Sequence, residues 1–190
     1  MYMNRKFILL ILTLMTILSV NVIAQKTETL ALSKKVVTAL KMKDMKTLST
    51  YVHPTKGVRF SPYSFVDKDK DRVFSKSQIS GLFAIKRQYV WGEYDGSGKP
   101  IKKTFRNYFS EFIYDRDFAR AKKISYENQI GAGNTGFNLK EIYPSSKFVE
   151  FHYPNSKGGD AMDWSSLLLV FEKGGNKWYL VGIIHNQATV

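Results

Sequence analysis

The sequence predicts an α+β fold in which N-terminal helices pack on a strongly curved antiparallel sheet. Residues 27–52 have apolar side chains at helical spacing, and residues 147–185 contain three apolar segments with the length of strands. The last two of these segments are joined by KGGN, a glycine-containing turn typical of a β-hairpin. Helices first and a closing hairpin last, with one helical stretch among the strands, are the element order of an α+β domain.

The first 24 residues have the pattern of a secretory signal. Arg5 and Lys6 form a basic start, residues 7–20 are apolar apart from three hydroxyl-bearing residues, and small or apolar residues precede the bond between Ala24 and Gln25. The alternative is an uncleaved membrane anchor, but the run of 14 residues is shorter than the roughly 20 that a spanning helix needs. We therefore expect a signal peptide at residues 1–24 and export to the periplasm or the extracellular space.

The expected mature chain, residues 25–190, has the length of a single domain. It has no cysteine, which excludes disulfides and thiolate catalysis. It also has no second long apolar run, so we expect no transmembrane segment after cleavage. Removal of the signal leaves 27 Lys and Arg against 16 Asp and Glu, a net charge of +11, and residues 25–50 and 99–123 carry most of this excess.

This basic excess attracts polyanions, which outside a cell include anionic envelope polymers, lipid headgroups and acidic proteins. The alternative is a solvated basic surface that aids solubility. Nucleic acid is not an expected partner, because no nucleic-acid-binding motif accompanies the charge.

The domain is expected to begin with two helices. Residues 27–42 have an apolar face opposite a lysine-rich face, and Asp44 is an N-cap for a second helix that His53-Pro54 ends. Gly57 then turns the chain into a short strand at residues 58–60. Residues 67–72, DKDKDR, are expected to form an exposed loop, because their alternating acids lack the glycine and the glutamate of an EF-hand.

The rest of the domain is expected to be mainly strands. Residues 75–83 indicate a short helix, and residues 83–91 a strand in which alternate side chains share an apolar face. A glycine-rich turn at residues 92–100 lacks the spacing of a phosphate loop, and residues 104–114 have an aromatic stripe typical of a core helix. Further strands are expected at residues 121–130, 147–153, 165–172 and 177–185.

This order resembles the NTF2-like superfamily, which includes SnoaL-like and ketosteroid-isomerase-like proteins. The resemblance is carried by the helix pair closed by LSTYVHP and by the final SLLLVFEKGGNKWYLVGIIH. YVHPTKGVRFSPYSFVD and MDWSSLLLVFE are also similar to segments of a family of uncharacterised exported bacterial proteins. The resemblance implies a cone-shaped sheet with a possible cavity, and a possible homodimer formed through the sheet. It implies no catalytic residue, because no position matches the superfamily's catalytic motifs.

Three histidines, His53, His152 and His185, have no partner at metal-ligand spacing, so no metal and no cofactor is expected. Strand alternation places His152 with Glu150, on the face opposite the apolar residues of that strand, so His152 is expected to be exposed or at the sheet rim. His185 would close the alternating apolar face that begins at Tyr179.

Arg87 is the best physical sign of a ligand site. Alternation places its guanidinium on one face with Tyr89 and Trp91, where an unpaired charge is costly. Arg87 should therefore have a carboxylate partner, lie at the sheet edge or bind an anionic ligand. If the fold resemblance holds, His53 and Arg59 lie near the rim of the cone, where they could contact the same ligand.

Asp163 is a further candidate ligand residue and the candidate base of an enzyme. It stands beside Trp164, and a carboxylic acid against an indole can have a raised pKa and act as a base; it can equally cap a turn. Ser165-Ser166 lacks the glycine-flanked elbow of a serine hydrolase.

Three functions remain open from the sequence. The first is a non-enzymatic exported module that binds a small ligand or an anionic envelope component. The second is a small-pocket enzyme, an isomerase or a hydrolase, that uses Asp163 with a histidine and so needs both groups to face one cavity. The third is a basic surface that binds acidic polymers.

Overall fold

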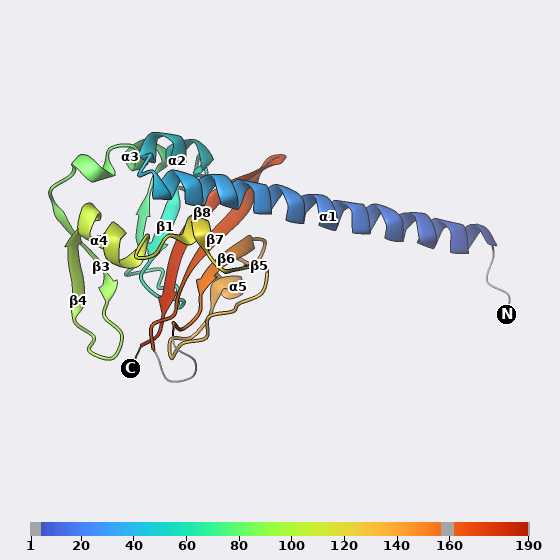
Figure 1. Cartoon of the computed structure of the whole chain (residues 1–190). Coiled ribbons are helices and arrows are strands. Elements are labelled where there is room, and N and C mark those ends of the chain that lie inside the picture. Colours follow the sequence, from blue (N-terminus) through green and yellow to red (C-terminus); the bar gives the residue numbers. More distant parts are fainter. Residues whose placement is uncertain (1–4, 157–161, 190) are drawn as a thin grey trace.

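The computed structural model describes residues 5–156 and 162–189, with side chains from residue 20 onward. It has a six-stranded sheet with helices on both faces and a separate two-stranded sheet (Figure 1). Along the chain the elements are α1 (Arg5–Lys41), α2 (Met45–Tyr51), β1 (Val58–Ser61), β2 (Arg72–Phe74), α3 (Lys76–Ile79), η1 (Leu82–Ala84), β3 (Gln88–Glu93), β4 (Pro100–Thr104), α4 (Phe105–Phe112), η2 (Phe118–Arg120), β5 (Lys123–Tyr126), α5 (Leu139–Ile142), β6 (Lys147–Tyr153), β7 (Ser165–Gly174) and β8 (Lys177–Gln187).

The larger sheet has the strand order β2-β1-β8-β7-β6-β5. Its neighbouring strands run antiparallel except β1 and β8, which pair in parallel with Phe60 opposite Ile183. The predicted α+β class is confirmed. The prediction of a wholly antiparallel sheet was wrong for one pair, β1 and β8. The chain path explains it, because Val52 at the end of α2 already forms a parallel bridge with Leu180, so β1 enters the sheet alongside the last strand.

The closing hairpin of β7 and β8 is confirmed, and it contains a bulge. The pairing shifts next to Phe171, where β8 has the extra residue Val181. Val181 therefore joins the apolar cluster on one face of the sheet, whereas its neighbour Leu180 belongs to the cluster on the other face. The sequence predicted that alternate residues from Tyr179 to His185 share one face of the sheet. The bulge breaks this alternation, because residues before and after an extra residue exchange faces.

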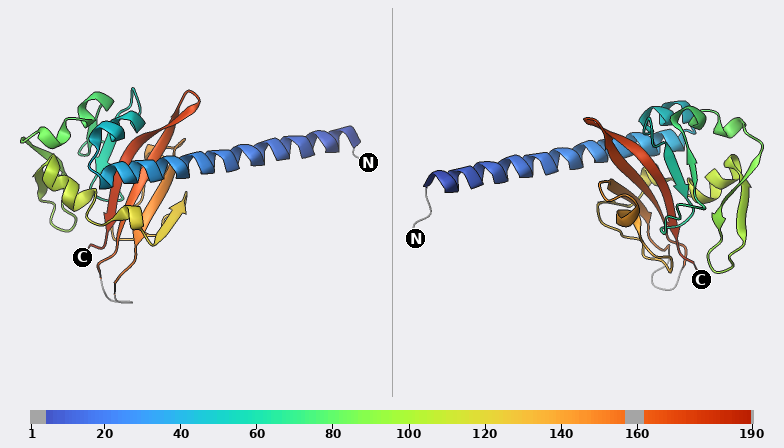
Figure 2. Two further views of the ribbon diagram at one scale, coloured as in Figure 1. Left: turned by 45° about the horizontal axis from the view of Figure 1, so that its top comes forward. Right: turned by 180° about the vertical axis from the view of Figure 1, so that it is seen from behind.

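Apolar side chains cover both faces of the sheet. One face packs against the C-terminal part of α1, α2, α4 and the small sheet, and Figure 2 shows α1 crossing this face. The opposite face packs against α5 and the segment that precedes it. The aromatic stripe predicted for the core helix is confirmed in α4, where all four members are buried: Phe105, Tyr108, Phe109 and Phe112.

The local signals at the start of the domain are also confirmed. Asp44 is the N-cap of α2, and its carboxylate accepts a hydrogen bond from the Thr47 N–H at 2.9 Å. Helix α2 ends before His53, and Gly57 then turns the chain with a φ of 68°. A Cβ at Gly57 would lie 2.3 Å from the carbonyl oxygen of Phe74, so only glycine fits this turn.

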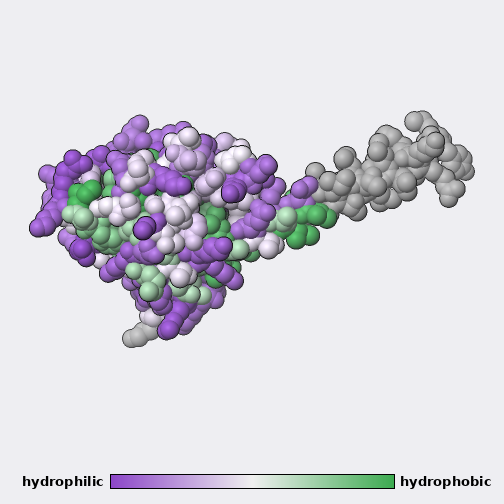
Figure 3. Space-filling view, turned by 90° about the horizontal axis from the view of Figure 1, so that it is seen from above, coloured by the Kyte–Doolittle hydropathy of each residue, from purple (hydrophilic) through white to green (hydrophobic). Residues whose placement is uncertain are grey.

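Helix α1 projects well beyond the rest of the molecule (Figure 1). Val22 and Ile23 are exposed, and Figure 3 shows hydrophobic surface where the helix leaves the body. Contact with the body is made further along, where Thr29 is fully buried and the ammonium of Lys26 lies 5.7 Å from the centroid of the Tyr126 ring.

The predicted signal peptide falls on this projecting part of α1. Its residues 1–4 and its side chains up to residue 19 lie outside the part of the chain that the structure describes. The helix runs without a break through the bond between Ala24 and Gln25. Among the described residues, no helix combines the length and the apolar character needed to cross a membrane.

The strand predicted for residues 83–91 begins later than expected. Residues 82–84 form the 3-10 turn η1, and β3 begins only at Gln88. Arg87 precedes β3, and it is exposed. Strand alternation therefore does not apply to Arg87, because Phe83 lies in a helical turn and residues 85–87 belong to no strand.

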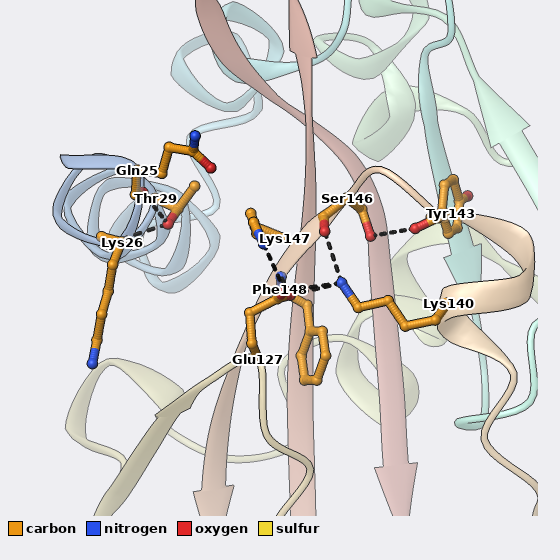
Figure 4. A network of polar contacts seen from close by, with 9 residues as sticks. All are labelled: Gln25, Lys26, Thr29, Glu127, Lys140, Tyr143, Ser146, Lys147 and Phe148. Atoms are coloured by element: carbon orange, nitrogen blue, oxygen red, sulfur yellow. Dashed lines mark hydrogen bonds and ion pairs between the residues drawn. The ribbon is translucent and has the colours of Figure 1, made fainter. Parts of the chain in front are cut away.

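A charged cluster ties α5 to the sheet (Figure 4). Glu127 directly follows β5, and its carboxylate accepts hydrogen bonds from the ammonium groups of Lys140 at 2.9 Å and Lys147 at 3.0 Å, and from the Phe148 N–H at 3.0 Å. Burial acts to raise the pKa of Glu127, but the two ammonium groups outweigh it and hold this pKa below its ordinary value. The cluster fixes the end of β5 to the start of β6 and to α5.

Candidate functional site

A cleft with a volume of about 430 Å³ lies between three segments of the chain. These are residues 62–71, the β3–β4 hairpin around residues 92–98, and residues 135–136. A second hollow of about 280 Å³ adjoins it and shares Lys70, Asp71, Gly92 and Glu93. The volume of the cleft is within the range of small-molecule sites.

Hydrogen bonds hold together two loops, distant in sequence, that form one wall of the cleft. The side chain of Asn138 accepts a hydrogen bond from the Val66 N–H at 2.8 Å and donates one to the Val66 carbonyl at 3.0 Å. The hydroxyl of Ser64 donates to the Gly136 carbonyl at 3.1 Å. The loop after β1 and the loop before α5 therefore form one continuous surface.

Arg59 holds the segment that contains the acidic loop. Its guanidinium donates hydrogen bonds to the carbonyl oxygens of Asp67 at 3.2 Å, Lys68 at 3.3 Å and Asp71 at 3.5 Å. Its Nε donates to the Tyr143 hydroxyl at 3.2 Å. A guanidinium has several donors in fixed geometry, which suits it to bridge these groups. Arg59, predicted as a ligand residue, thus binds the backbone of the loop behind the cleft.

Asp71 is the buried acid of the cleft, with 8% of its surface exposed. Its Oδ2 accepts hydrogen bonds from the Ser61 hydroxyl and, at 3.0 Å, from the Asp67 N–H. Its Oδ1 has no hydrogen-bond partner within the described ranges, and it lies toward Gly92, where a Cβ would be 3.9 Å away. Burial raises the pKa of Asp71 to about 7, against the opposing effect of the hydrogen bonds from Ser61 and Asp67.

Two tyrosines accompany this acid. The hydroxyl of Tyr108 is buried and has no hydrogen-bond partner in the described structure. Burial, with a contribution from the charge of Asp71, raises the pKa of Tyr108 well above its ordinary value. Tyr63 lines the cleft, and burial raises the pKa of its hydroxyl as well. Both phenols are therefore neutral at physiological pH, so Tyr63 can donate or accept a hydrogen bond toward the cleft.

The cleft is negatively charged. Asp67, Asp71, Glu93 and Asp95 line it together with one ammonium group, that of Lys70, which is paired with Glu93 at 2.8 Å. The charge contrasts with that of the whole chain, which is +13. The basic excess seen in the sequence therefore does not extend into the cleft.

The ligand residues predicted on the aromatic strand, Arg87, Tyr89 and Trp91, lie in different environments. Trp91 is fully buried, and its Nε1 donates a hydrogen bond to the Lys103 carbonyl at 2.9 Å. Tyr89 is half-buried, with its ring against that of Trp91. The guanidinium of Arg87 lies 4.6 Å from the centroid of the Tyr89 ring and has no carboxylate partner among the residues described. None of the three predicted residues lines the cleft.

His53 and Asp163, also predicted as ligand residues, lie away from the cleft. His53 is buried at the end of α2, where its Nδ1 accepts a hydrogen bond from the Lys56 N–H at 3.1 Å. Asp163 accepts a hydrogen bond from the Ser156 N–H at 2.9 Å, and hydrogen bonds from Ser156 hold the pKa of Asp163 below its ordinary value. Within the described part of the chain, no hydrogen bond or ion pair joins Asp163 to a histidine.

The other two histidines lie on opposite faces of the sheet. The Nδ1 of His152 is 2.8 Å from the Ser166 hydroxyl, and a hollow of about 270 Å³ lies beside the ring, lined also by Trp164. The Nε2 of His185 is 3.1 Å from Asp115 Oδ1. His152 was expected to be exposed or at the sheet rim; exposure was wrong, because the side chain is buried and residues 130–132 lie beside it. Asp163 and the three histidines therefore do not meet in either hollow, and the pair that the enzyme hypothesis requires does not face one cavity.

Sequence reasoning did not select Asp71, because it stands in the alternating-charge segment DKDKDR. Lys68, Asp69 and Lys70 are exposed as that pattern predicts, whereas Asp71 packs inward. The one local signal is its position just before strand β2. No group of three or more acidic or histidine side chains suited to hold a metal ion occurs in the ranges described, so the acids of this loop form no metal cluster there.

No family model and no curated protein matches the chain. Among solved structures, it is similar to one assigned as a calcium/calmodulin-dependent protein kinase II association domain from Xanthomonas campestris, with 14% identity and a TM-score of 0.34 over 86% of each chain. The α+β class of this chain rests on its own helices and strands.

Proposed function

We propose that the chain is an exported, non-enzymatic module that binds a small molecule in the cleft beside Asp71. The observation that carries the proposal is the junction of a cavity of about 430 Å³ with a buried carboxyl group that has one oxygen without a hydrogen bond among the described residues. This oxygen is not fully enclosed, so a ligand can reach it from the cleft. A hydrogen bond donated to it by a ligand would be strengthened by the largely buried surroundings of Asp71.

Export is the part of the proposal that rests on the N-terminal segment. The contacts of Lys26 and Thr29 with the body lie just beyond the expected cleavage point, whereas Val22 and Ile23 are exposed. Removal of residues 1–24 would therefore leave the contacts of the body in place. We expect the secreted protein to begin at Gln25 by intact-mass measurement, and a chain that starts there to unfold at the same denaturant concentration as the full chain.

A fragment-binding experiment tests the cleft. We expect small organic fragments to shift the amide NMR signals of residues 92–98 and 135–136. Gly136→Leu should weaken this binding at least about tenfold, because the new side chain enters the cleft, where its Cβ would lie 3.5 Å from Phe65. Gly81→Leu is the matched control, because Gly81 lies outside the cleft and an added Cβ would be no closer than 3.9 Å to its nearest neighbour, the Gln78 carbonyl oxygen. Fragment shifts that spare the cleft, or equal binding by the Gly136→Leu variant, would refute the proposal.

A second candidate function is binding of an anionic envelope polymer, and a different surface favours it. The two basic parts of the sequence run side by side in the fold, since Lys41 pairs with Asp117 at 2.7 Å and Lys26 lies over Tyr126. Residues 26–41 of α1 therefore lie along residues 117–126 in the opposite direction. On these segments five exposed lysines have no ion-pair partner in the part described: Lys26, Lys34, Lys35, Lys122 and Lys123.

Retention on a heparin column tests this second function. We expect the full chain to bind and to elute at lower salt when Lys34 and Lys35 are both changed to Glu, because salt screens exposed charges. Lys86→Glu with Lys177→Glu makes the same change in charge outside the two basic segments. Equal elution of the two double variants would show that general charge, and not this surface, is responsible. The homodimer that the fold resemblance implies remains a separate prediction, for which the mass in solution is the test.

A further inference from the structure

One carboxylate oxygen of Asp71, Oδ1, can accept a hydrogen bond from a ligand. Both hydrogen bonds to its carboxylate reach Oδ2, and Oδ1 is directed toward Gly92 at the border of the cleft and the adjoining hollow. A Cβ at Gly92 would lie 3.3 Å from the side chain of Pro62 and 3.9 Å from Asp71 Oδ1. Gly92 thus leaves space beside this oxygen, with a φ of 116° that other residues rarely adopt. A ligand atom that enters this space must be a hydrogen-bond donor to satisfy the oxygen.

The charge around this oxygen favours a cation. Asp67, Asp71, Glu93 and Asp95 line the cleft, and the single ammonium group of Lys70 is already paired with Glu93. The guanidinium of Arg72 lines the adjoining hollow, and that of Arg59 acts on Asp71 from behind the cleft, but the four acids outnumber these cationic groups. A cation would therefore be attracted more strongly than an anion. The positive charge of the rest of the chain makes this local potential more selective, because it holds cations away from the remaining surface.

Aromatic rings supply the second half of the site. Tyr63, Phe65 and Tyr94 line the same cleft, and Phe65 exposes 52% of its surface there. Their ring faces can hold a flat apolar group and can also attract an ammonium group. The neutral hydroxyl of Tyr63 has a hydrogen bond with the backbone of Asp95, and it can form a further one with a polar part of the ligand.

We propose that the cleft selects a protonated organic amine, with the ammonium group on Asp71 Oδ1 and an attached aromatic or similar flat group against Tyr63, Phe65 and Tyr94. This inference rests on the proposed function, because it names the chemical class of the ligand that the cleft binds. It differs from the anionic ligand expected for Arg87, and the reason is the position of Arg87 outside the cleft.

Three probes of one shape test the charge requirement by NMR titration at pH 8: phenethylamine, 2-phenylethanol and 3-phenylpropionate. We expect the amine to bind about tenfold more tightly than the neutral alcohol, because both can donate a hydrogen bond to Asp71 but only the amine adds a positive charge. The carboxylate should be the weakest, because its charge repels that of Asp71. The fragment shifts should fall on residues 92–98 and 135–136.

Substitutions test whether Asp71 is responsible for the preference for the amine. Asp71→Asn should remove most of the tenfold preference for the amine and leave the affinity for the alcohol unchanged. Asp95→Asn, at an exposed position of the cleft mouth, should lower the amine affinity severalfold without disturbing the fold. Asp163→Asn is the matched control, since it removes one carboxylate outside the cleft.

The outcomes separate this inference from the function on which it rests. Equal affinity for amine and alcohol, or an Asp71→Asn variant that keeps the preference, would overturn the amine assignment and leave small-molecule binding in place. If none of the three probes and no other fragment shifts the signals of the cleft, the proposed function fails together with the inference. Tighter binding of the carboxylate than of the amine would reverse the predicted charge of the ligand.

Discussion

Trp91 and Tyr108 are fully buried and stack face to face, with ring centroids 4.0 Å apart and an angle of 11° between the ring planes. Trp91 comes from β3 and Tyr108 from α4, so the pair joins the small sheet to the helix that covers the larger one. Phe60 packs edge-on against both rings and connects them to β1. The position of Trp91 is therefore structural.

Replacement of Trp91 tests this role. We expect Trp91→Ala to lower the free energy of unfolding by about 3–5 kcal/mol, because it removes a fully buried ring and its contacts. Trp91→Phe keeps a ring but loses the hydrogen bond to the Lys103 carbonyl, so its effect should be smaller. Chemical denaturation followed by circular dichroism measures both. Trp178→Ala, at a half-buried position, is the control, and an equal loss there would contradict the central role of Trp91.

The raised pKa of Asp71 predicts an unusual pH dependence of stability. In the unfolded chain this carboxyl group titrates near about 4, whereas in the folded chain its pKa is about 7. The folded state therefore binds the proton more tightly, and this contribution to stability is fully present below about pH 4 and is lost as the pH rises through 7. Arg59 opposes the shift, whereas the charge of Asp67 adds to it.

Denaturation at several pH values checks this prediction. Between pH 4 and 7 the wild-type chain should lose stability relative to Asp71→Asn by up to about 1.4 kcal/mol per pH unit, the limit for one proton. The comparison with Asp71→Asn removes the contribution of all other groups. Parallel stability profiles for the two proteins would show that Asp71 has an ordinary pKa.

Arg59 is expected to hold the acidic loop, residues 67–71, in a fixed conformation. Arg59→Lys keeps the charge but cannot bridge three carbonyl oxygens and the Tyr143 hydroxyl, so we expect a loss of about 1–3 kcal/mol in stability. Amide hydrogen exchange at residues 67–71 should become faster. Arg106→Lys changes an exposed guanidinium that lies over the Phe83 ring and should leave this exchange unaltered. Unchanged protection of the loop in Arg59→Lys would argue that the loop is held by its own turns.

The charged cluster of Glu127 should stabilise the molecule at neutral pH. Glu127→Gln is expected to cost about 1–3 kcal/mol, because two ammonium groups and a backbone N–H lose a charged acceptor. Since the folded pKa of Glu127 lies below its ordinary value, its contribution is present above the unfolded pKa and is lost as the pH falls through the folded value. Acid denaturation monitors this loss. Glu111→Gln removes a more exposed ion pair with Lys103 and should cost about 0–1 kcal/mol.

Much of the architecture could be predicted because it depends on local patterns. The N-cap Asp44 follows from side-chain chemistry within one turn, and the stripe on α4 follows from helical spacing. The two long closing strands followed from their continuous apolar character and the glycine turn between them. The parallel pairing of β1 with β8 could not be predicted in this way, because β1 is a short strand whose neighbour lies more than a hundred residues further along the chain.

The ligand residues were harder to predict for the same reason. Strand alternation placed Arg87 on a buried face, but the turn η1 interrupts this alternation. His152 was expected to be exposed or at the sheet rim, because local alternation does not reveal the loop from another part of the chain that lies beside it. Asp71 was treated as one more charge in an exposed loop. Its burial depends on Ser61, on Arg59 and on the hairpin that contains Gly92, none of which the local pattern DKDKDR reveals.

The sequence by itself determined the α+β class, the helices at the start of the domain and the closing hairpin, because hydrophobic periodicity, caps and turns act between residues close in the chain. Only the tertiary structure decided which charged groups are buried and which side chains share a cavity. Burial and charge depend on segments brought together from distant positions, so the negative cleft around Asp71 exists only once residues 62–71, 92–98 and 135–136 are packed against one another.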